Sequence, residues 1–239
     1  MTDYASTTQT PPVEAGTKNS FQRIAGVLFA PVDTFRDIAR RPDILVPLLV
    51  ILIVSFAGSI LTMNLVDWDA MIAQQSEQMK RQNPNMTDAD IERMSGMTRA
   101  MGKVSAFVGP LVMIAWYAIV AGVLLLAFRL MGGEGTYKQA FSATLYAWMP
   151  LVLFGVIATI VIMARGSFDP TQMATLVKSN PAFLVDMKEQ PVLFSLLSSL
   201  DVFTIWTVIL LIVGFAALSK SSIGKSATIV VSLWIVMIV

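Results

Sequence analysis

The sequence predicts an all-α, polytopic membrane bundle of five transmembrane helices, with an N-terminal interfacial helix and helical extracytoplasmic loops. Of the 239 residues, 55% are apolar and only 14% are charged, whereas soluble domains carry about a quarter charged residues. The mean hydropathy is +0.69 for a chain of 26.0 kDa. One globule of this size cannot bury so much apolar surface, so lipid must cover part of it.

The apolar segments have the length of membrane spans. A hydrocarbon core of about 30 Å takes roughly 20 helical residues to cross. The fourth segment is short and can extend backwards through residues 192–200, and the fifth reaches across if Lys225 extends its ammonium group to the interface. The five predicted spans are approximately residues 44–66, 104–130, 140–164, 200–219 and 222–239.

The chain ahead of the first span divides into a polar tail and an amphipathic segment. Residues 1–20 are rich in Ser, Thr and Pro and predict a disordered tail. Residues 21–43 predict a short helix on the membrane surface, and packing of this helix on protein loops is the alternative. The prediction rests on four apolar residues that share one helical face, Val32, Phe35, Ile38 and Ala39.

The first long loop, residues 67–103, is expected to be helical. Asp67–Gln82 suits a helix, Asn83-Pro84-Asn85 breaks it, and Thr87 with Asp90 resembles a second helix start. Lys and Arg gather in the short loops and at the N-terminal flank, which favours a cytoplasmic N-terminus and an extracytoplasmic C-terminus.

Composition excludes several classes of function. The chain has no cysteine and no histidine, which excludes disulfides, thiol nucleophiles, thiolate or imidazole metal sites and histidine-based acid–base catalysis. The net charge of +1 argues against a nucleic-acid partner. We predict no catalytic, cofactor-binding or metal-binding residues.

Two loop features invite a ligand-binding interpretation. The segment Gly132-Gly133-Glu134-Gly135-Thr136 superficially resembles a phosphate loop, but it lacks the Lys-Ser/Thr ending and the preceding strand. We expect a tight interhelical turn with glycines at positive φ.

Six methionines lie in the first long loop. Their thioethers would suit Cu(I), but methionine also packs adaptably against lipid or a neighbour. We expect packing for all six, Met71, Met79, Met86, Met94, Met97 and Met101.

Charged residues adjoin three of the predicted spans. Asp201, if drawn into the membrane, would indicate a proton or ion relay. At a helix start it is a good N-terminal cap, which is the role we expect. Arg129 and Arg165 end apolar runs, and we expect them to extend towards the interface rather than bind a substrate.

The spans also contain helix-breaking and small residues. Pro110 and Pro150 interrupt the second and third spans, as in the broken helices of transporters, although proline is common in membrane helices. Small residues four positions apart permit close helix approach, either in a compact bundle or at a dimer face. They are Ser55/Ser59, Ala118/Gly122 and Gly155/Thr159.

Three stretches resemble the Yip1 family, in its bacterial branch. They are FQRIAGVLFAPVDTF ahead of the first span, GGEGTYKQAFSATLYAWMP between spans two and three, and LDVFTIWTVILLIVGFAALSK in span four. They occur in the family's order, so we expect residues 21–239 to form one Yip1-like integral membrane domain. The resemblance implies five spans and a cytosolic N-terminus, and we expect the cytoplasmic (inner) membrane of a bacterium.

These observations lead to one main functional expectation. We expect a non-enzymatic integral membrane protein that organises or binds other membrane proteins or lipids. The alternative is a small permease or channel for a solute or ion, which would use Pro110, Pro150 and Asp201. The expected partners are the lipid bilayer and other membrane proteins, including a second copy of the chain. We expect neither a nucleic-acid partner nor a cofactor.

Overall fold

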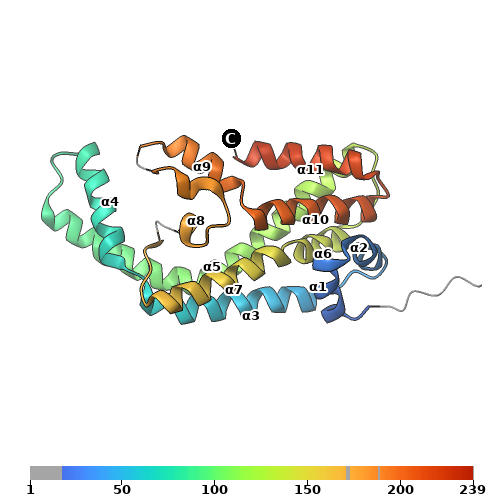
Figure 1. The fold of residues 1–239 in the computed structure, drawn as a ribbon, viewed down its shortest axis with the longest axis horizontal. Helices are drawn as coiled ribbons and strands as arrows, with labels where there is room; N and C mark the ends of the chain where they lie inside the picture. The colour runs from blue at the N-terminus through green and yellow to red at the C-terminus, as the bar shows by residue number, and fades with distance from the viewer. Residues whose placement is uncertain (1–17, 171–172, 188, 239) are drawn as a thin grey trace, which may run out of the picture.

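The computed structural model describes residues 18–170, 173–187 and 189–238, which are helical apart from loops and one isolated parallel bridge between Val66 and Phe168 (Figure 1). Residues 1–17 of the predicted disordered tail lie outside the described residues, and Ser20 already begins a helix. The helices are α1 (Ser20–Phe29), α2 (Pro31–Arg40), α3 (Leu45–Thr62), η1 (Met63–Leu65), α4 (Trp68–Gln82), α5 (Asp88–Leu130), α6 (Tyr137–Ala147), α7 (Met149–Arg165), α8 (Met173–Leu176), η3 (Pro181–Leu184), α9 (Pro191–Ser199), α10 (Val202–Ser219) and α11 (Ile223–Ile238).

Four helical segments among the described residues are long and apolar enough to cross a bilayer, namely Leu45–Leu65, Asp88–Leu130, Tyr137–Arg165 and Val202–Ser219. They confirm four of the predicted spans. The fifth predicted span corresponds to α11, a shorter apolar helix. The backward extension of the fourth span is wrong, because α9 ends at Ser199 and Asp201 caps a separate helix.

The third span consists of two helices. α6 ends at Ala147 and α7 begins at Met149, with Trp148 between them. Pro150 occupies the first turn of α7, where its missing N–H breaks no helical hydrogen bond. Pro110, in contrast, lies buried inside α5, which continues through it.

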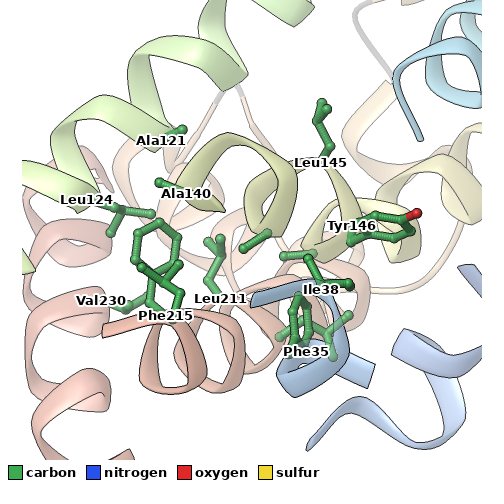
Figure 2. Packing of buried hydrophobic residues seen from close by; sticks show 14 of the residues in the cluster. Phe35, Ile38, Ala121, Leu124, Ala140, Leu145, Tyr146, Leu211, Phe215 and Val230 are labelled. Atoms are coloured by element: carbon green, nitrogen blue, oxygen red, sulfur yellow. The ribbon is translucent and has the colours of Figure 1, made fainter. Parts of the chain in front are cut away.

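Helices of the bundle cover the apolar face of the amphipathic segment. The apolar face of α2 packs on α10 and α6, and Phe35 and Ile38 are each only 1% exposed. Gly214 of α10 makes room for this contact, because a Cβ atom there would lie 3.0 Å from the Phe35 ring. Figure 2 shows Phe35 and Ile38 among core residues from α5, α6, α10 and α11. The prediction that this face lies on the membrane is therefore wrong, and the place of the helix beside the membrane surface stays a prediction.

The small residues in α3 and α7 bring these two helices together. A Cβ atom at Gly58 would lie 2.9 Å from Thr159 Oγ1, and Ser55, Ser59 and Gly155 line the same interhelical cavity. In α5, Ala118 accepts a hydrogen bond from the Tyr137 hydroxyl at 2.9 Å. Of the predicted small residues in α3 and α7, Thr159 lies at the close approach, whereas a Cβ atom at Gly155 would meet no atom within 4 Å.

α4 and the first part of α5 project from the bundle as an arm, defined here as residues 68–103 (Figure 1). α5 has 43 residues, a length of about 65 Å at 1.5 Å per residue, roughly twice the hydrocarbon thickness. The predicted helix starts are confirmed: Asp67 caps α4, and Thr87 and Asp90 form a capping box for α5.

Candidate functional site

A largely buried ion pair lies where α1 and α2 meet the bundle, a region we call the N-terminal junction (residues 18–43 with α6). The side chain of Arg23 is 6% exposed, and its Nε donates to Asp37 Oδ2 at 2.8 Å. Its NH1 group donates to the backbone carbonyl of Arg41, also at 2.8 Å. Because desolvating two charges is costly, a buried pair needs such additional hydrogen bonds. The pair joins α1 to α2.

Asp43 connects the N-terminal junction to α6. Its Oδ2 accepts hydrogen bonds from the Ser20 hydroxyl and, at 3.2 Å, from the Tyr146 hydroxyl. Its backbone carbonyl accepts from Ser142 Oγ at 2.7 Å, and its backbone N–H donates to the same oxygen at 3.2 Å. Ser142 and Tyr146 are fully buried. Asp43, two residues ahead of α3, thus connects α1 to α6.

Two further bonds secure the N-terminal junction. Gln139 Nε2 donates to the carbonyl of Ala39 at 2.7 Å, and Lys18 Nζ donates to Thr34 Oγ1 at 2.7 Å. These groups bond to one another across helices, so the arrangement positions the α1–α2 hairpin on the bundle.

Sequence reasoning did not identify this cluster, although a signal was present. Arg23 lies between Phe21 and Ile24 in an apolar stretch, and Asp43 directly precedes an uncharged span. Charged side chains so close to apolar surroundings are rarely buried without a partner. The partners of Asp43 could not be identified from the sequence, because Tyr146 lies about a hundred residues further along the chain.

The glycine-rich segment is a tight turn between α5 and α6, as predicted. Gly132 and Gly135 have φ values of 78° and 128°, which favour glycine because it has no Cβ. Arg129 donates to the carbonyl of Gly135 at 2.8 Å and so supports the turn. Lys220 Nζ lies 2.7 Å from Glu134 Oε2, and this hydrogen bond and the negative charge of Glu134 raise the pKa of Lys220. We call this end of the bundle the turn end.

Asp201 caps α10, which confirms the predicted role. Its Oδ1 accepts from the backbone N–H groups of Phe203 and Thr204 at 2.9 and 3.2 Å. Its Oδ2 accepts from the Ser179 hydroxyl, and Val202 donates its backbone N–H to the Ser179 carbonyl at 3.0 Å. Asp201 therefore also fixes the loop that leads into α10.

Two adjoining cavities lie between the membrane-spanning helices and the arm. One of about 260 Å³ lies between α3, α5 and α7 and is lined by Ser55, Thr159 and Tyr117 among apolar residues. A second of about 620 Å³ lies at the base of the arm, and both are lined by Ser59, Thr62 and Met173. Arg165, at the same end, lines a separate cavity of about 260 Å³ with Asp67 and Asp169.

The loop methionines do not form one cluster. Met71 and Met101 line the cavity at the base of the arm together with Met63 and Met173. Met94, Met97 and Met101 lie on α5 with exposed side chains. Of these three residues, Met101 borders the cavity at the base of the arm, and packing against lipid or a neighbour stays a prediction for Met94 and Met97.

Comparison with known proteins places the whole bundle in a family. The Yip1 domain model matches residues 25–239, which includes α2, the turn and every span. A similar curated protein is membrane protein YknW of Bacillus subtilis (strain 168), which is 25% identical over 231 residues, covering 93% of this chain and 90% of YknW. No solved structure matches. The chain is a multi-pass membrane protein that belongs to the Yip1 family.

Proposed function

We propose that the chain is a non-enzymatic membrane scaffold, which organises or binds other membrane proteins from a bundle anchored in the bacterial cytoplasmic membrane. The observation that carries the proposal is the arm. α4 contains no buried residue, so its helix does not serve to fill a core, and the arm extends well beyond the length that the bilayer requires. A long ordered helical pair with free sides is suited to holding another protein.

The orientation we propose places the turn end in the cytoplasm and the arm outside. Basic residues in short loops remain on the cytoplasmic side. The eight Lys and Arg residues at the arm end are spread over its longer loops, whereas the turn end carries nine of the 17, in short connections or beside the first span. The basic residues are Lys18, Arg23, Arg36, Arg40, Arg41, Arg129, Lys138, Lys220 and Lys225.

Photo-crosslinking in native membranes tests the scaffold proposal. A photoreactive residue at Gln75 or Gln78, both exposed on α4, should yield discrete adducts with other membrane proteins. Ile160, which is 61% exposed on α7 at membrane depth, provides the matched lipid-facing control. Adducts from α4 no more abundant than those from Ile160 would refute the proposal.

The adjoining cavities favour one alternative, a small permease. Ser55 and Thr159 line the cavity between α3, α5 and α7, which adjoins the cavity at the base of the arm, and intramembrane polar residues often mark a transport path. Solute or ion flux into liposomes containing the purified protein tests this function. Flux abolished by Ser55→Val, with unchanged thermal stability, would favour transport over scaffolding.

A further inference from the structure

An apolar seam runs along the outer side of α5, from the arm into the membrane. Its residues follow the alternating three- and four-residue spacing of a heptad repeat, in which positions a and d form a helix–helix contact. With Met94 at position a, the seam extends over 22 residues, about 33 Å. The seam residues are Met94, Met97, Met101, Val104, Val108, Leu111 and Ala115.

Most of the seam faces away from the rest of the chain, while Met101 also borders the cavity at the base of the arm. Met97, Met101 and Val104 are 64%, 61% and 60% exposed, while Pro110 and Tyr117 on the other side of α5 are buried in the bundle. α4 does not cover the seam, because it packs on a neighbouring side of α5. There, the Trp68 ring occupies the space where a Cβ of Gly102 would lie, and Asp69 pairs with Arg99.

Lipid cannot cover the whole seam. Val104, Val108 and Leu111 belong to the apolar span, where hydrocarbon chains surround them at no cost. Met94, Met97 and Met101 lie in the arm, beyond Lys103 and on the same turns as charged Arg93 and Arg99. Water faces that part of the helix, so an uncovered methionine row there leaves apolar area exposed, which is unfavourable by roughly 25 cal/mol per Å².

We infer that a second copy of this chain covers the seam, so that two α5 helices pair in parallel about a two-fold axis normal to the membrane. The inference rests on the proposed scaffold function and deepens it by naming one bound membrane protein. Two copies inserted in the same orientation bring the same heptads to the same depth, so the seam meets itself in register, as a two-fold interface requires.

The flanks of the seam permit this self-association. Positions e and g beside it are uncharged over its central part, where they are Thr98, Ala100, Ser105 and Phe107. Charges at these positions usually select a partner of opposite sign, and two copies here meet without like-charge repulsion. Val108 at position a and Leu111 at position d match the preference of parallel two-stranded pairs.

Disulfide scanning tests the pairing, because the chain has no natural cysteine. In native membranes under mild oxidation, Met97→Cys, Met101→Cys and Val104→Cys should form cross-linked dimers readily. Gly96→Cys and Lys103→Cys lie at position c, at similar depths but on another side of the helix, and should cross-link several-fold less. Equal yields at seam and control positions, or monomer at all of them, would overturn the inference.

Mass measurement gives an independent readout. Light scattering should give the wild type twice the 26.0 kDa chain mass. The double variant Met97→Glu with Met101→Glu should weaken association by about tenfold or more, whereas Gly96→Glu, where a side chain meets no atom within 4 Å, should not. A monomeric wild type would refute the pairing. If photo-crosslinked adducts from Gln75 and Gln78 still formed, the scaffold proposal would stand without the pairing. If they did not form either, both the pairing and the scaffold proposal would be refuted.

Discussion

The ion pair between Arg23 and Asp37 provides the sharpest test of how the N-terminal junction is held. Replacing Arg23 with alanine leaves the carboxylate of Asp37, only 20% exposed, without its cationic partner, and frees the Arg41 carbonyl. Breaking a buried pair from one side typically costs 3–5 kcal/mol. We expect about 3 kcal/mol for Arg23→Ala, the lower end, because Asp37 keeps some contact with water.

Thermal unfolding followed by intrinsic tryptophan fluorescence measures this effect. At about 2–4 °C per kcal/mol for a chain of this size, the midpoint should fall by roughly 6–12 °C. The control is Arg36→Ala, whose pair with Asp33 has side chains 64% and 76% exposed and should contribute under about 1 kcal/mol. The double variant Arg23→Met with Asp37→Leu should recover most of the loss, because it leaves no unpaired buried charge. Equal effects of Arg23→Ala and Arg36→Ala would show that the pair does not hold the hairpin.

Three further changes test other contacts by the same melting assay. Gly214→Ala should cost about 1–3 kcal/mol by overpacking, since its methyl group would press on the Phe35 ring; no loss would mean that α2 can move away freely. Asp201→Asn should be tolerated and Asp201→Ala should cost about 1 kcal/mol, because Oδ1 caps α10; full loss of function in a stable Asp201→Asn protein would instead indicate a relay. Thr207→Val should be neutral or stabilising by about 1 kcal/mol, because the buried Thr207 hydroxyl has no partner among the described residues; a marked loss would reveal one.

Local signals made most of the secondary structure predictable. The apolar runs that became α3, α5 and α10 need a bilayer whatever their neighbours are. The starts of α4 and α5 depend on residues at most three positions apart, Asp67 with Ala70 and Thr87 with Asp90, so the sequence alone identifies them. The positive φ angles in the turn likewise follow from glycine placement.

The tertiary partners were not predictable in the same way. Hydrophobic periodicity showed that α2 has an apolar face but not what covers it, because lipid and protein satisfy such a face equally well. Contact with α10 depends on Gly214, almost 180 residues after Phe35, whose role is only to leave space. The cluster around Asp43 was not predictable for the same reason. Ser142 and Tyr146 become partners of Asp43 only when α6 folds against α1 and α3, and nothing near them in the sequence indicates this contact.

The continuity of α5 bears directly on how a scaffold could work. The C-terminal half of α5 packs in the bundle. The ring centroids of Tyr117 and Trp148 lie 4.7 Å apart there, and those of Phe128 and Phe215 lie 5.2 Å apart. Because the same helix continues without a break into the arm, the packing of the bundle sets the direction of the arm before any partner arrives. A partner then binds an ordered surface and loses less conformational entropy on association than a flexible loop would require. A break in the helix between these two halves should therefore weaken partner binding while leaving the bundle folded.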